Sequence, residues 1–136
     1  MERIEFTVPA IPVAQPRARA TAINGRARMY EASSKHPVHA FKATLRLAAA
    51  EAYKGPPLEG PLSAQILFVF PMKSQRIRKP KATKPDCDNL AKSVLDALNG
   101  LMFGDDGQVV RLEVEKWHAN GMEQPHVRIA ISRLAP

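Results

Sequence analysis

All five aspartates of this chain lie between residues 86 and 106, although the chain as a whole carries a formal charge of +7. They are Asp86, Asp88, Asp96, Asp105 and Asp106. Carboxylates that lie close together repel one another unless a cation sits among them, so such a cluster destabilises an empty site. Mg²⁺ removes this repulsion, and it prefers one or two carboxylates completed by water and phosphate oxygens to a closed protein cage. The cluster therefore predicts an open Mg²⁺ site, which Mn²⁺ could also fill.

The first acidic pair lies in the stretch PDCD, where Asp86 and Asp88 alternate with Cys87. Residues two apart in an extended segment point the same way, so both carboxylates could share one ion. Asp88 alone is equally well explained as the N-cap of a helix. Lys92 follows one turn later, where it could neutralise charge that develops on a phosphate or form only a weak surface ion pair. The pair is the stronger indication of a metal.

The second acidic pair, Asp105 and Asp106, lies in the stretch GDDGQ at the far end of a predicted helix. A straight helix would separate it from Asp88 by about 15 Å or more. The two pairs can meet only if residues 99–104 fold back or the next strand returns alongside the helix. Read locally, GDDG is a turn. The two pairs are close in sequence, and this does not establish that they are close in space.

Cys87 and the histidines do not offer a competing site. Two carboxylates flank the thiol of Cys87, which disfavours its thiolate. His36, His39, His118 and His126 show no metal-ligand spacing. With a single cysteine no intrachain disulfide can form, so we expect the reducing cytoplasm as the compartment.

Hydrophobic periodicity predicts the elements that hold these residues. Residues 62–70 are apolar on both faces, which is typical of a central strand. The stretch ANGMEQP reads as a hairpin loop between two half-buried strands, the first with Val110, Leu112 and Val114 inward. We expect one α+β domain over residues 1–136, with a small mixed or antiparallel four-stranded sheet and two main helices in the order β-α-β-α-β-β. The predicted strands are 4–8, 62–70, 108–118 and 126–132, and the predicted helices are 38–53 and 89–99.

Two basic segments adjoin these elements. Residues 9–37 form a proline-rich loop, with either a short hairpin around Asn24-Gly25 or a disordered arm, and residues 73–84 form a second loop without any acidic residue. A charge run is usually a solvated loop, but here it leads directly into the aspartates. The cations that we expect to contact phosphate are Arg17, Arg19, Arg26, Arg28, Lys73, Arg76, Arg78, Lys79, Lys81 and Lys84.

The overall charge points to an anionic partner. A pI of about 9.9 favours nucleic acid first and an anionic membrane surface second. No window approaches the roughly 18 apolar residues of a membrane span, and the N-terminus lacks the apolar core of a signal peptide. We therefore expect neither a membrane protein nor a secreted one.

The stretches KPDCDNLAKSVLDALNG and DDGQVV, with the basic run before them and EVEKWH and HVRIAIS after them, resemble the Holliday junction resolvase family typified by RusA. This family is found in bacteria and their phages. The resemblance covers residues 62–132 well, and its motif, D-x-D-N-L-x-K followed by DD-x-Q-V, is long and specific. The first third of the chain is similar only in its strand, its loop PVAQPRAR and its helix.

The resemblance implies a small α+β homodimer, with one magnesium-dependent site per subunit, that cuts two opposed strands of a four-way DNA junction. Asp86 and Asp88 match the first two acidic residues of the family's site, Asp106 matches the acidic residue of the distal loop, and Lys92 matches the active-site lysine. The spacer leaves open whether Asp105 or Asp106 is the ligand.

We therefore expect a Mg²⁺-dependent, structure-selective endodeoxyribonuclease of DNA recombination and repair. It would act on four-way junctions or other branched DNA and on no small-molecule substrate. Two alternatives stay open. One is a catalytically silent junction-binding protein of a phage, and the other is a nuclease that prefers forks and other branched DNA.

Overall fold

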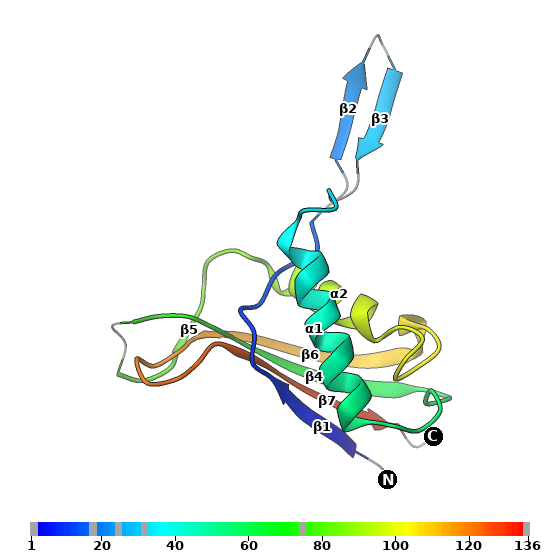
Figure 1. The fold of residues 1–136 in the computed structure, drawn as a ribbon, viewed down its shortest axis with the longest axis vertical. Helices are drawn as coiled ribbons and strands as arrows, with labels where there is room; N and C mark the ends of the chain where they lie inside the picture. Colours follow the sequence, from blue (N-terminus) through cyan, green and yellow to red (C-terminus); the bar gives the residue numbers. More distant parts are fainter. Residues whose placement is uncertain (1–2, 17–18, 24–25, 31–32, 74–75, 135–136) are drawn as a thin grey trace.

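The computed structural model describes residues 3–16, 19–23, 26–30, 33–73 and 76–134. Five strands form one mixed sheet in the order β1-β7-β4-β6-β5 (Figure 1). They are β1 (Arg3–Val8), β4 (Leu62–Phe70), β5 (Lys79–Pro80), β6 (Val109–His118) and β7 (His126–Arg133). The predicted α+β class is confirmed. The sheet has one strand more than predicted, because the two residues of β5 add to its edge.

The two last strands do not form a hairpin, contrary to the prediction. β4 lies between them, parallel to β6 and antiparallel to β7. The loop that joins β6 to β7 therefore passes over the end of β4, where the backbone of Ala119 donates to the carbonyl of Phe70 at 2.8 Å. β4 is buried along most of its length, as its apolar sequence predicts for a central strand.

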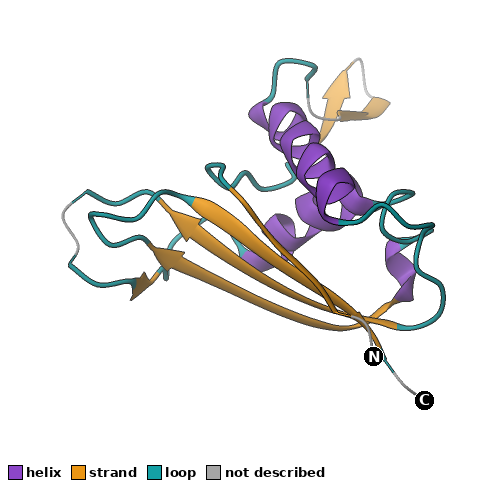
Figure 2. Cartoon of the chain, turned by 60° about the horizontal axis from the view of Figure 1, so that its bottom comes forward, coloured by secondary structure: helices purple, strands orange, loops and turns teal. Residues whose placement is uncertain are grey.

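Two helices cover one face of the sheet and leave the other face open (Figure 2). Helix α1 (Pro37–Ala52) buries Val38, Phe41, Leu45 and Ala49, which recur at helical spacing. Helix α2 (Cys87–Leu98) packs against α1 and buries Leu90, Val94 and Leu98. Both stripes join one hydrophobic core with the inward residues of β4 and β7. Among the described residues, no helix is both long and apolar enough to cross a membrane.

A separate two-stranded ribbon projects from the body of the molecule (Figure 1). Its strands are β2 (Arg19–Ile23) and β3 (Arg26–Tyr30), and they pair antiparallel. The hairpin alternative for this basic segment is therefore confirmed. Asn24-Gly25, predicted as its turn, lie outside the described residues.

The start of β6 differs from the half-buried strand that was predicted. Val110 is 63% exposed and Leu112 is 44% exposed. The register shifts opposite Leu62, which pairs with Val109 while Ser63 pairs with Arg111, so Val110 has no partner on β4. On the edge of β6 that faces away from β4, no strand pairs with it in the described chain until β5 pairs with Trp117 and His118. The backbone of Lys81 also donates to the carbonyl of Lys116, so the open edge among the described residues runs from 109 to 115.

Candidate functional site

The first acidic pair lies at the N-terminus of α2. This helix begins at Cys87, two residues earlier than predicted, with Asp86 as its N-cap at φ −77° and ψ 149°. Asp88 is therefore in the first helical turn, and the prediction that Asp86 and Asp88 alternate along an extended segment is wrong. The error has a simple cause, since both residues are aspartates and either is a good N-cap. Both carboxylates still lie at the positive end of the helix dipole.

Neither carboxylate of this pair is buried. Asp88 is exposed, and its Oδ1 accepts a hydrogen bond from the backbone of Asn89 at 2.9 Å. The side chain of Asp86 is 42% exposed and makes no capping hydrogen bond; its Oδ2 lies 3.6 Å from the Nζ of Lys84. A phosphate oxygen or an ion with its waters can reach both side chains from solvent.

The loop that leads into Asp86 is held by β6. The Nζ of Lys116 donates to the carbonyl of Thr83 at 2.7 Å and to that of Pro85 at 2.8 Å. The backbone of Lys81 donates to the carbonyl of Lys116 at 3.0 Å. Sequence reasoning missed Lys116, although a signal was present. It falls on the same alternation as Val110, Leu112 and Val114, so it is a lysine at a predicted inward position.

The second acidic pair lies at the other end of α2. Asp105 is the N-cap of the short helix η1 (Asp106–Gln108), and its Oδ2 accepts from the backbone of Gly107 at 2.8 Å. Gln108 returns the bond, since its Oε1 accepts from the backbone of Asp105 at 3.1 Å. Asp105 therefore stabilises a turn with its side chain, whereas Asp106 is half-buried and accepts the C-cap bond of η1 only through its carbonyl.

The structure does not bring the two acidic pairs together within one chain. Between them lies α2, whose 12 residues span about 18 Å at 1.5 Å per residue. Among the described residues, no group of three His, Cys, Asp or Glu side chains is placed to hold a metal ion. Gln108 anchors the second pair to the loop before β4, because its Nε2 donates at 3.0 Å to the carbonyls of Leu58 and Gly60.

Asp96 pairs with Lys92 on its own helix and with Lys42 on α1. The Nζ of Lys92 lies 3.5 Å from the Oδ1 of Asp96, and the Nζ of Lys42 on α1 lies 3.7 Å from its Oδ2. Asp96 is thus accounted for as a helix-pairing residue. Lys92 remains 59% exposed and one turn from Asp88, where a bound phosphate could compete with Asp96 for its ammonium.

The cations of the second basic loop are not equivalent. Lys73, Arg76 and Lys79 are exposed. Arg78 instead forms a bidentate pair with Glu123 in the loop between β6 and β7, with its Nε 2.8 Å from Oε2. These hydrogen bonds lower the pKa of the Glu123 carboxyl and raise the pKa of the Arg78 guanidinium. Arg78 anchors the loop, so it is less available to phosphate than its exposed neighbours.

Lys81 and Lys84 lie closer to the acidic pair. Lys81 donates to the hydroxyl of Thr83 at 3.0 Å, and its Nζ lies 5.0 Å from the centre of the Phe70 ring. Lys84 is the partner of Asp86 described above, with a side chain that is 88% exposed. The basic loop therefore ends at the carboxylates, as its sequence predicts.

The basic ribbon is tied to the same end of α2. Residues 9–16 lie against that helix, where the backbone of Gln15 donates to the carbonyl of Asn89 at 2.9 Å and the hydroxyl of Ser93 donates to the carbonyl of Val13 at 2.8 Å. Arg17 lies outside the described residues, and Arg19, Arg26 and Arg28 belong to the paired strands β2 and β3. Residues 9–16, which we call the strap, therefore run past the N-terminal end of α2, close to Asp88.

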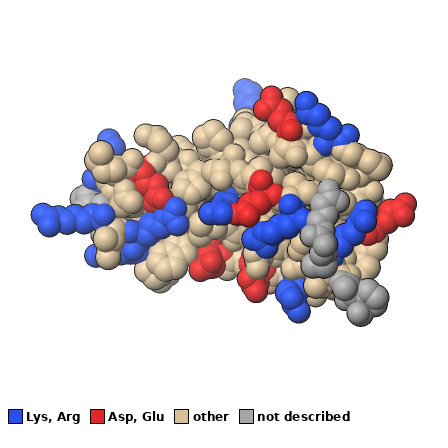
Figure 3. Space-filling view, turned by 90° about the horizontal axis from the view of Figure 1, so that it is seen from below, with Lys and Arg blue, Asp and Glu red and all other residues tan. Residues whose placement is uncertain are grey.

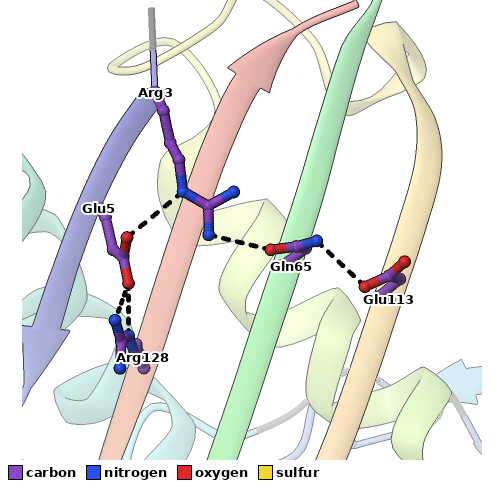
Figure 4. Close-up of polar contacts among 5 residues, drawn as sticks. All are labelled: Arg3, Glu5, Gln65, Glu113 and Arg128. Atoms are coloured by element: carbon purple, nitrogen blue, oxygen red, sulfur yellow. Dashed lines mark hydrogen bonds and ion pairs between the residues drawn. The ribbon is translucent and has the colours of Figure 1, made fainter.

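The side of the molecule seen in Figure 3 is different in character. Basic and acidic side chains are interspersed there, so it presents no continuous positive surface. Across the sheet, Glu5 accepts hydrogen bonds from Arg128 and Arg3, and these lower the pKa of its carboxyl (Figure 4). Arg3 also donates to Gln65, which donates to Glu113. These neutralised pairs make this surface a poorer partner for DNA than the basic ribbon and loop.

Comparison with known proteins agrees with the sequence resemblance. The family model described as Endodeoxyribonuclease RusA matches residues 9–132. A curated relative, the uncharacterized protein YqaN of Bacillus subtilis (strain 168), is 36% identical over 148 residues, which cover 99% of each chain. The match extends into the first third of the chain, where the motifs resemble the family less closely.

Proposed function

The chain belongs to the RusA endodeoxyribonuclease family, and from this we propose that it is a divalent-metal-dependent endonuclease that resolves four-way DNA junctions. The observation that supports the proposal most is the environment of the Asp86 and Asp88 carboxylates. Two accessible carboxylates lie at a helix N-terminus, and the basic loop that ends at Lys84 leads directly into them. The residues that lead to the basic ribbon, at Val13 and Gln15, are hydrogen-bonded to the same end of α2. A protein that only binds DNA gains nothing from carboxylates facing phosphate.

The donor set fits Mg²⁺ as an open site. Asp86 and Asp88 offer two accessible carboxylates, and Mg²⁺ usually keeps several waters and takes the remaining oxygens from a phosphate. When bound, the ion would supply an activated water and stabilise the leaving oxygen of the phosphodiester. Lys92 would balance negative charge on the phosphate. Lys84 would leave its ion pair with Asp86 and bind a phosphate of the DNA backbone.

The exposed cations would hold the DNA backbone without reading bases. Lys73, Arg76 and Lys79 are exposed in the loop that leads toward Lys84, and the sequence of the ribbon offers Arg19, Arg26 and Arg28 as further candidates. Contacts of this kind give affinity and orientation but carry no sequence information. Selectivity for a branched substrate would then come from the spacing of two sites.

A homodimer would bring the second acidic pair into the site. Asp86 and Asp106 lie beyond opposite ends of α2, a helix about 18 Å long. The open edge of β6, with Val110 and Leu112 exposed, suits a second copy of this chain, because an unpaired strand edge is a template for another strand. Antiparallel pairing of two β6 strands about Leu112 and Glu113 would set Val110 of one copy beside Glu115 of the other.

In such a dimer Asp106 of one subunit would approach Asp86 of the other, and two equivalent sites would be related by a twofold axis. A four-way junction offers strands with approximate twofold symmetry, so the two sites could cut two of them alike. The separation of the acidic pairs within one chain thus becomes a reason for dimerisation.

The test is incubation of the purified protein with end-labelled four-way junction, replication fork and linear duplex, each with and without Mg²⁺. The proposal predicts cutting of the junction that requires Mg²⁺ and is much faster than cutting of duplex. A faster rate on forks would instead favour the alternative branched substrate. Tight junction binding without cutting in Mg²⁺ or Mn²⁺ would make the protein a binder and reject the proposal.

A further inference from the structure

Lys116 is the residue outside the acidic pair whose contacts bear most directly on it. Its side chain is half-buried on β6, and its ammonium reaches the carbonyls of Thr83 and Pro85, at 2.7 and 2.8 Å. These partners lie 33 and 31 residues away in sequence. Pro85 directly precedes Asp86. In the described chain Lys116 forms no ion pair with a carboxylate, so its charge serves these two backbone acceptors.

Hydrogen bonds from an ammonium to a carbonyl are stronger than those between neutral groups, and two of them fix the loop in place. The backbone bond from Lys81 to the carbonyl of Lys116 holds the same loop five residues before Asp86. Lys116 therefore holds the loop at Lys81, Thr83 and Pro85, in the five residues before Asp86. The hydrophobic core in turn fixes β6 through β4, which pairs with it along its length.

The two carboxylates depend on this loop to different degrees. Asp88 belongs to α2, which is held by the buried side chains of Leu90 and Val94. Asp86 is the N-cap: its carbonyl accepts a hydrogen bond from the backbone of Leu90 at 3.1 Å, but its side chain makes no capping bond. The direction of its carboxylate therefore depends on the incoming loop as well as on the helix. A movement of the loop would change the spacing between the two carboxylates.

We propose that Lys116 is a positioning residue that sets Asp86 against Asp88 for metal binding. The inference rests on the proposed function of these two carboxylates as metal ligands. Residues that orient metal ligands without contacting the metal themselves commonly contribute 10- to 100-fold to metal affinity. Lys116 would do so through the backbone, while touching neither the ion nor the DNA.

The sign of the effect separates positioning from simple electrostatics. A cation near a metal site repels the metal, so removing the charge of Lys116 would by itself tighten metal binding. Loss of positioning would weaken it. The direction of the change in Kd for the metal therefore decides between the two roles.

The experiment measures Mn²⁺ binding to the protein without DNA, by electron paramagnetic resonance of free Mn²⁺. The variants are Lys116→Met, which keeps the aliphatic stem, and Lys116→Arg, which keeps the charge and some donors. Lys54→Met, an exposed lysine just after α1, is the control for net charge. Lys116→Gln serves if the methionine variant does not fold, and thermal unfolding monitors every protein.

We expect Lys116→Met to raise the Kd for Mn²⁺ about tenfold, with Lys116→Arg between it and the wild type. In an Asp86→Asn background the same substitution should have no further effect, because it acts through Asp86. Unchanged or tighter Mn²⁺ binding by a folded Lys116→Met variant would overturn the inference. If the wild type bound no Mn²⁺ and cut no DNA, the proposed function itself would fail, and the inference with it.

Discussion

The backbone N–H of Gln15 donates to the carbonyl of Asn89, one residue after Asp88, at 2.9 Å. This bond joins the last described residues before the basic ribbon to the first turn of α2. The hydroxyl of Ser93, fully buried one turn later, makes the parallel bond to Val13. These bonds therefore join the strap to the end of α2 that carries the acidic pair.

Ser93→Ala should loosen this attachment without touching the carboxylates. The substitution leaves the carbonyl of Val13 without its donor, which we expect to lower the free energy of unfolding by about 1–2 kcal/mol. Junction affinity should fall because the ribbon is less well placed, while the cutting rate at saturating protein should change little. Thermal unfolding and junction binding in Ca²⁺ measure the two effects. A normal affinity with a lowered Tm would show that the strap serves stability alone.

Lys79→Gln should weaken junction binding through a lost phosphate contact. Each contact between a cation and phosphate adds roughly one unit to the slope of log affinity against log salt, so this slope should decrease by about one. Lys54→Gln, which removes a charge just after α1, should leave the slope unchanged. Equal slopes for both variants would place Lys79 outside the interface.

The ion pair of Arg78 with Glu123 should make the stability of the basic loop depend on pH. The pKa of the Glu123 carboxyl is lowered in the folded protein, so the pair stabilises it above the carboxyl's unfolded pKa of about 4.3. That contribution is lost as the pH falls through the folded pKa. Glu123→Gln should therefore lower the stability at pH 7 by up to about 1 kcal/mol and have no effect once the carboxyl is protonated. Urea unfolding of both proteins at pH 7 and near pH 3 tests this, and a difference that persists at low pH would contradict it.

Mixing two inactive variants should restore cutting if each site is built from two chains. In a heterodimer of Asp88→Asn with Asp106→Asn, one site would carry both substitutions and the other neither. Mixed and re-equilibrated proteins should then nick one strand of a junction, although each variant alone is inactive. If each site lay within one chain, both sites of the heterodimer would carry one substitution and no nicking would return.

Much of this arrangement could be predicted from local patterns. The apolar run from Leu62 to Phe70 predicts β4 with its observed bounds, and the spacing of Leu90, Val94 and Leu98 predicts the buried stripe of α2. The order of the strands could not be predicted in the same way. A short loop between two alternating strands suggests a hairpin, whereas β4 pairs with both strands because it is the most apolar and occupies the centre.

The candidate site shows the same division. The residue types at 86, 88, 105 and 106 indicate metal chemistry, but the distance between the two pairs depends on how α2 ends and how Gln108 binds the loop at Leu58 and Gly60. Lys116 lies 30 residues beyond Asp86, and its role depends on tertiary contacts that no local motif encodes. The local sequence indicates this role only in that Lys116 falls on the predicted inward-facing positions of β6.

The most direct measurement is the position of the nicks in a four-way junction labelled in each of its four strands in turn. The wild type, Asp88→Asn and Asp96→Asn would be compared at saturating Mg²⁺. The last variant is the matched control, because Asp96 joins the helices through Lys42 and is not a proposed ligand. We predict paired nicks at symmetric positions in two opposed strands for the wild type and Asp96→Asn, and junction binding without nicks for Asp88→Asn. Cutting by Asp88→Asn at the rate of the wild type would contradict the role of the acidic pair in catalysis.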